Sequence, residues 1–215
     1  MQPAAGADRR MCLPWWPPPF LPPLLPRRGI FVSGRGCYAG GMNTSLDFLP
    51  GRWALLILPH DGHSDLLVAA ARLAHCGPVV ILDGGNRCNA YTLARATGGR
   101  PEVLGRIFLS RAFTCYQMAA LLEETSASGA PVLVLDFLAT FYDEAVSAFE
   151  RRRLLEGCLV ELRRLSRGAG VAVSVCLPRL ASPENGALLA SLHAAADGVW
   201  SPAPALPAAE PPRLF

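Results

Sequence analysis

The sequence VLVLDF at residues 132–137 is an apolar run broken only by Asp136 near its end. A strand that is apolar at consecutive positions has both of its faces covered, which is typical of parallel sheets in α/β proteins. Four further stretches have a similar character and are expected to form strands of the same sheet: ALLILP at 54–59, PVVILD at 78–83, RIFLSR at 106–111 and VAVSVCL at 171–177.

Helical segments separate these strands. Ser64 is positioned to cap a helix that runs to about His75, and a short helix is expected over 90–97. Thr114 and Gln117 have the spacing of a capping box before another helix. The longest helix is expected over 144–167, and Asn185 is expected to cap the last one. Because strand–helix units repeat along the chain, we predict an α/β fold: a three-layer αβα sandwich with a mostly parallel central sheet.

The two ends of the chain differ from this pattern. Residues 1–41 are rich in proline, which removes helix donors, and we expect them to be disordered or polyproline-like. No uninterrupted apolar run there reaches the roughly 20 residues that span a bilayer. Met42 precedes the first recognisable element, so translation from Met42 is an alternative. We therefore predict an α/β domain over 42–202, a flexible tail over 203–215 and no membrane association.

Composition limits the chemistry that this chain can perform. All 20 basic residues are arginine, so no site can use a lysine ammonium group. The net charge of +3 is too small to indicate a nucleic-acid partner by itself. The seven cysteines are scattered and form no C-x-x-C pair, which argues against a disulfide framework or a zinc knuckle. We expect them to be reduced residues of a cytoplasmic protein.

The candidate site lies where the strands end. Ligands of parallel α/β sheets bind beyond the carboxyl ends of the strands. The segments that follow the expected strands are therefore the ones to inspect, and they comprise residues 60–64, residues 83–87, Arg111, Asp136, Pro178 and Arg179.

Residues 106–178 are similar to the core of RecA/RadA-type recombinases and their KaiC-like relatives. The segment 111–114 (RAFT), followed by Gln117, looks like the part of that family that precedes the Walker B strand. Residues 132–136 resemble the Walker B strand itself, and 138–142 (LATFY) its exit. The likeness in order and spacing extends over 54–178, and it implies a RecA-like P-loop NTPase fold that uses ATP with Mg²⁺.

The same resemblance implies the site residues. Gly62, His63 and Ser64 fall where the P-loop has Gly, Lys and Ser or Thr, so Ser64 and Asp136 would hold Mg²⁺. Asp83 falls where the family has a strand ending in an Asp and a catalytic Glu. The chain departs from the pattern in three places: His63 replaces the lysine, the catalytic Glu aligns near Gly85, and the polar sensor aligns near Pro178.

Loss of the lysine removes charge stabilisation on which most phosphoryl-transfer catalysis depends. We therefore expect a non-hydrolysing RecA-like protein that binds ATP weakly or not at all. Its expected role is that of an accessory subunit in DNA recombination or repair, which binds a protein partner or further copies of itself.

Two alternatives remain open at this stage. The first is a nucleotide- or metal-dependent enzyme with a rebuilt site, since mixed histidine and carboxylate sets bind Zn²⁺ or Mn²⁺. Its ligands would come from His60, Asp61, His63, Asp83 and Asp136. The second concerns the arginines at 151–153, which form either a solvated helix face or a contact for DNA phosphates.

Overall fold

A six-stranded parallel sheet forms the centre of the protein. The computed structural model describes residues 50–60, 62–176 and 182–201, which all belong to one unit of the chain. The predicted Pro-rich segment 1–41, the tail 203–215, Asp61, Pro178 and Arg179 lie outside these residues. No helix in the described part is long and apolar enough to cross a bilayer.

The strands follow the order β3-β2-β4-β5-β1-β6, and every neighbouring pair is parallel. The prediction of a mostly parallel sheet is therefore confirmed. The strand bounds are Trp53–Leu58 for β1, Val79–Asp83 for β2, Ile107–Arg111 for β3, Val132–Leu135 for β4, Val171–Cys176 for β5 and Gly198–Trp200 for β6.

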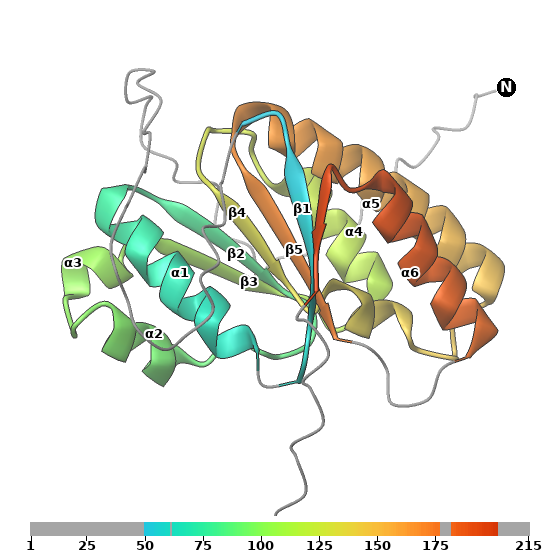
Figure 1. Cartoon of the computed structure of the whole chain (residues 1–215), viewed down its shortest axis with the longest axis horizontal. Coiled ribbons are helices and arrows are strands. Elements are labelled where there is room, and N and C mark those ends of the chain that lie inside the picture. Colours follow the sequence, from blue (N-terminus) through green and yellow to red (C-terminus); the bar gives the residue numbers. More distant parts are fainter. Residues whose placement is uncertain (1–49, 61, 177–181, 202–215) are drawn as a thin grey trace, which may run out of the picture. The chain divides into compact units, whose positions relative to one another are not determined.

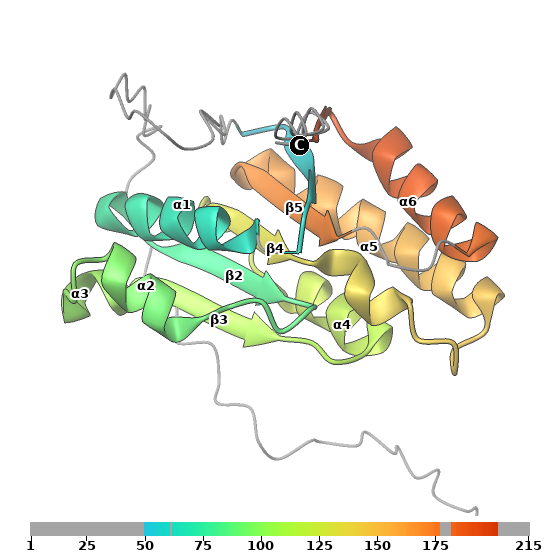
Figure 2. The same ribbon diagram turned by 60° about the horizontal axis from the view of Figure 1, so that its bottom comes forward.

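Helices cover both faces of the sheet. Figures 1 and 2 show α1, α2 and α3 on one face and α4, α5 and α6 on the other, which makes three layers. Their bounds are His63–Cys76 for α1, Ala90–Ala96 for α2, Pro101–Leu104 for α3, Cys115–Glu124 for α4, Ala148–Gly168 for α5 and Pro183–Ala195 for α6, with a 3₁₀ turn, η1, at Phe137–Phe141.

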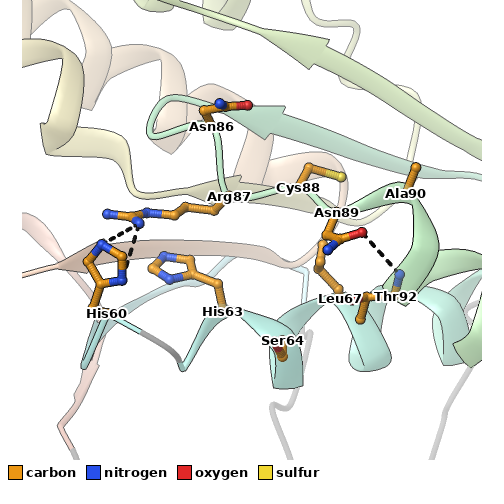
Figure 3. Close-up of a pocket in the computed structure, with 10 residues that line it drawn as sticks. All are labelled: His60, His63, Ser64, Leu67, Asn86, Arg87, Cys88, Asn89, Ala90 and Thr92. Atoms are coloured by element: carbon orange, nitrogen blue, oxygen red, sulfur yellow. Dashed lines mark hydrogen bonds between the residues drawn. The ribbon is translucent and has the colours of Figure 1, made fainter.

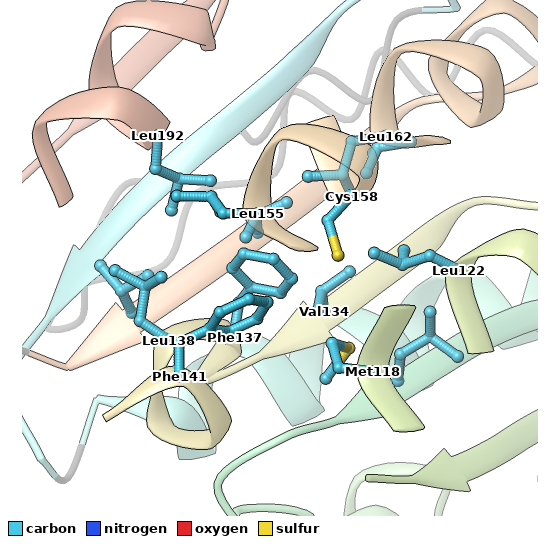
Figure 4. Packing of buried hydrophobic residues seen from close by; sticks show 14 of the residues in the cluster. Met118, Leu122, Val134, Phe137, Leu138, Phe141, Leu155, Cys158, Leu162 and Leu192 are labelled. Atoms are coloured by element: carbon cyan, nitrogen blue, oxygen red, sulfur yellow. The ribbon is translucent and has the colours of Figure 1, made fainter. Parts of the chain in front are cut away.

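The inner strands β1, β2, β4 and β5 are largely apolar because alternate residues enter two separate cores, whereas the edge strand β3 is partly exposed. Val132 and Val134 of β4 pack in one core with α4, α5 and α6, whereas Leu133 and Leu135 pack in the other with α1. The first core is the larger and contains the rings of Phe137 and Phe141, whose centroids are 5.1 Å apart (Figure 4). Burial on both faces explains why these runs lack the alternation of half-exposed strands.

Two of the predicted helix caps are wrong. Gly62, not Ser64, occupies the N-cap of α1, and Ser64 lies inside the helix with an exposed side chain. Ser182, not Asn185, caps α6, because the Ser182 hydroxyl accepts a hydrogen bond from the Asn185 N–H. The cap predicted at Thr114 is confirmed, since its hydroxyl accepts from the Gln117 N–H.

Several boundaries also differ from the prediction. Ser147 caps α5, so this helix begins at Ala148 instead of residue 144. The strand β4 ends at Leu135 because Asp136 adopts a left-handed conformation, with φ of 47°. The short helix α3, which begins with Pro101, was not predicted.

Candidate functional site

The candidate site lies at the carboxyl ends of β1, β2, β4 and β5. From these ends the chain continues to α1 and α2 on one face of the sheet and to α5 and α6 on the other (Figure 1). Adjacent strands whose connections leave to opposite faces open a crevice in which α/β proteins bind ligands. A cavity of about 550 Å³ lies here, between the segments 60–67 and 86–92 (Figure 3).

Asp136 is the most constrained residue at this edge. Its side chain is 2% exposed, and its positive φ is uncommon for a residue with a β-carbon. Its backbone N–H donates to the Ser174 hydroxyl on β5 at 3.0 Å. Its Oδ1 accepts from the Cys176 N–H at 3.0 Å, and its Oδ2 accepts from Nε of Arg87 at 2.8 Å. The carboxylate therefore ties β4 to β5 and to the β2–α2 segment.

Arg87 extends this network to the loop after β1. One of its terminal nitrogens lies 2.7 Å from Nε2 of His60. The same nitrogen of Arg87 lies 3.5 Å from Nδ1 of His60, so this contact joins the β2–α2 segment to the imidazole that follows β1. Figure 3 shows the Arg87 side chain reaching from the β2–α2 segment toward the His60 ring.

Asp83 is fully buried and already holds a full set of donors. Its two oxygens accept the backbone N–H groups of Arg87 and Cys88, at 2.8 and 3.0 Å. Nε of Arg111 on β3 adds an ion pair at 3.1 Å. Because burying a carboxylate is costly unless it is paired, these bonds make Asp83 an organiser of the β2–α2 turn.

His63 is the first residue of α1 and is 3% exposed. Its Nδ1 lies 3.9 Å from Sγ of Cys176, and none of the described residues offers a hydrogen-bond partner to its Nε2. Burial lowers the pKa of His63 below its usual value, although the charge of nearby Asp136 acts in the opposite direction. The imidazole is consequently neutral at physiological pH.

The positions expected from the sequence to correspond to a P-loop, Gly62 to Ser64, fit bound Mg²⁺-ATP poorly. The Gly62 N–H is donated to the Pro59 carbonyl at 3.0 Å, so it is not directed at a phosphate. Ser64 is exposed and lines the cavity from the second position of α1 (Figure 3). Asp136, the other expected Mg²⁺ ligand, is paired with Arg87.

The structure therefore brings some of the predicted site residues together and holds others apart. His63 and Asp136 come together, whereas His60 contacts Arg87 and Asp83 is held by the β2–α2 turn and Arg111. Sequence reasoning assigned no role to Arg87 and treated Cys176 only as a core residue. The sequence did offer one clue to Cys176: it lies at the end of the fifth strand, and therefore at the same edge of the sheet as Asp136.

The arginine cluster at 151–153 is not a uniformly solvated face. Arg151 is 4% exposed, forms an ion pair with Glu184 of α6, and donates to the Phe141 carbonyl at 3.2 Å. Arg152 is exposed, and Arg153 pairs with Glu150 one turn earlier in α5. Only two of the three guanidinium groups thus remain at the surface.

No protein-family model matches the chain, and no curated protein matches it significantly. Its functional interpretation therefore depends on the geometry described above and on the resemblance of its sequence pattern.

Proposed function

We propose that this chain is a non-hydrolysing RecA-like protein that acts as a partner-binding accessory subunit in DNA recombination or repair. The observation that carries the proposal is the Arg87–Asp136 ion pair, with Nε and Oδ2 2.8 Å apart. In the RecA-like interpretation Asp136 should face Mg²⁺ and a phosphate-binding loop, yet here Arg87 offsets the charge of that carboxylate and the Gly62 N–H is directed to the Pro59 carbonyl.

The neighbouring groups support the same conclusion. A phosphoryl-transfer site stabilises negative charge with a lysine, Mg²⁺ and an oriented water. His63 stands at the lysine position as a buried neutral imidazole, and Gly85 stands near the position of the catalytic Glu. Each difference removes a group that would stabilise the transition state, so the site lacks the charges that phosphoryl transfer requires.

Exposed aromatic and aliphatic side chains support a role in binding a partner. Phe108 and Leu109 on the edge strand β3 are 48% and 43% exposed, and Phe113 and Tyr116 follow at 71% and 50%. Successive strand residues point to opposite faces, so Phe108 and Leu109 flank the edge of the sheet on its two sides. An edge strand presents unpaired backbone groups, and exposed apolar side chains beside such an edge favour a protein interface. This surface suits a related α/β subunit or a second copy of the chain.

The catalytic half of the proposal is tested by phosphate release from ATP and Mg²⁺, with and without single-stranded DNA. The full chain is compared with Asp136→Ala, which controls for contaminating ATPases. We expect equal rates, because Asp136 does not hold Mg²⁺ in the native protein. A wild-type rate that exceeds that of Asp136→Ala would refute the proposal.

The partner half is tested by light scattering and by capture of RecA-like proteins on the full chain. Phe113→Ser removes an exposed ring beside β3, and Phe149→Ser removes a ring of similar exposure (78%) on α5 as a matched control. We expect Phe113→Ser alone to weaken association. An equal effect of both substitutions, or no association of the wild-type chain, would contradict the proposal that the surface beside β3 binds a partner.

A further inference from the structure

Three buried side chains meet beside the cavity. His63 follows β1, Asp136 follows β4, and Cys176 ends β5, so each belongs to a different strand end. One potential ligand atom from each lies within 4.8 Å of the other two. His63 also lines the cavity, which places the group next to solvent-accessible space.

The spacing suits a single small cation. In tetrahedral zinc sites the bonds measure about 2.3 Å to sulfur and about 2.1 Å to histidine nitrogen, which places these two ligand atoms about 3.6 Å apart. Sγ of Cys176 and Nδ1 of His63 are 3.9 Å apart. A small rotation of either side chain therefore brings both atoms to bonding distance of one ion.

A second observation points to a ligand independently of the spacing. His63 is more than nine-tenths buried, yet none of the described residues satisfies its Nε2. Buried polar side-chain atoms are nearly always satisfied, so Nε2 must meet water or another group from the cavity, and Nδ1, which faces Cys176, is the ring nitrogen left for the ion.

The donor set selects the type of metal. A thiolate, an imidazole and a carboxylate suit Zn²⁺, whereas Mg²⁺ prefers oxygen ligands only. The thiolate and carboxylate together balance the charge of a divalent ion. Asp136 can bind the ion while it keeps its bonds to Arg87 and to the Cys176 N–H, since each carboxylate oxygen has a second lone pair. Those two donors then orient the ligating carboxylate.

We propose that His63, Asp136 and Cys176 bind one Zn²⁺ ion, whose fourth position is open to water or a small ligand from the cavity. On binding, the Sγ–H bond of Cys176 breaks, an Sγ–zinc bond forms, and the proton passes to solvent. The ion would connect the ends of β1, β4 and β5. This proposal goes beyond the proposed function and is independent of it, because ATP turnover and zinc binding are measured separately.

The test uses the full chain, stripped with a chelator and titrated with Co²⁺ as a spectroscopic substitute for Zn²⁺. We expect one equivalent to produce a thiolate-to-cobalt charge-transfer band that Zn²⁺ abolishes. Cys176→Ser should remove the band, and His63→Gln should weaken binding at least about tenfold. Cys88→Ser is the matched control, because Cys88 lines the same cavity outside the triad, and it should behave as wild type.

X-ray absorption of the zinc-loaded wild-type chain reads the ligands directly and does not depend on whether a variant folds. We expect one sulfur neighbour together with nitrogen and oxygen neighbours. Absence of sulfur in that spectrum, absence of the cobalt band, or a band lost in Cys88→Ser but kept in Cys176→Ser would each overturn the proposal.

Discussion

Gly85 packs directly against Asp136, so closely that a β-carbon on Gly85 would lie 2.6 Å from the Asp136 Cβ. Real β-carbons essentially never approach other heavy atoms to that distance. The β2–α2 turn can therefore lie against the end of β4 only because position 85 has no side chain. This close approach brings Arg87 within reach of the Asp136 carboxylate.

Gly85→Ala should lower the free energy of unfolding by about 1–3 kcal/mol, the usual cost of overpacking. Gly157→Ala is the control, since Gly157 lies inside α5 with no atom within 4 Å of its added β-carbon. It should raise the free energy of unfolding by about 0.5–1 kcal/mol, because alanine favours helix interiors. Urea unfolding of both variants measures these free energies. A change of the same sign in both would contradict the close packing of Gly85 against Asp136.

The Arg87–Asp136 pair should show energetic coupling in a double-mutant cycle of Arg87→Ala and Asp136→Asn, measured with a chelator present. Both side chains are mostly buried, at 22% and 2% exposure, so we expect a coupling of about 1–2 kcal/mol in unfolding free energy. The exposed pair Arg153–Glu150 is the control and should couple more weakly. Equal coupling energies in the two cycles would show that the Arg87–Asp136 pair stabilises the fold no more than an exposed ion pair does.

Arg151 should contribute to stability, whereas its neighbour should not. Arg151→Ala leaves the Phe141 carbonyl without this donor and removes the ion pair with Glu184, so we expect a loss of about 1–3 kcal/mol. Arg152 is exposed, and Arg152→Ala should change unfolding free energy by less than about 0.5 kcal/mol. Thermal and urea unfolding distinguish the two, and a comparable loss in both would show that the cluster acts as a single surface.

Asp197 should make stability depend on pH. The Trp53 N–H and the Arg163 guanidinium, at 2.9 and 2.8 Å, lower the pKa of Asp197 below its usual value. A lowered pKa in the folded state gives stability that is present above the unfolded value, about 3.9, and is lost as pH falls through the folded value.

Asp197→Asn should therefore be slightly less stable than wild type at pH 7, because solvent screens these surface interactions, and this deficit should shrink as the pH falls below about 4. Urea unfolding between pH 3 and 7 measures it. Glu156→Gln, a substitution at an exposed position of α5, is the control and should follow wild type throughout. A deficit that stays constant down to pH 3 would exclude the electrostatic explanation.

The sequence alone predicted five of the strands and most of the helices, and it placed the candidate site at the carboxyl ends of the strands. The apolar runs at β1, β2, β4 and β5 are local patterns, and each was predicted to within one or two residues. The absence of lysine and the acidic residues at the ends of β2 and β4 are likewise visible in the printed chain. They identify the position of the site because parallel strands end at a common edge.

Only the tertiary structure decided which polar groups pair with one another. Arg87 and Asp136 are 49 residues apart, and Cys176 and His63 are 113 apart. Their contacts depend on the strand order β2-β4-β5-β1, which no local pattern encodes. The caps and the burial of Arg151 depend in the same way on neighbours distant in sequence. Periodicity specifies elements, whereas the free energy of burying charges selects their partners once the strands are assembled.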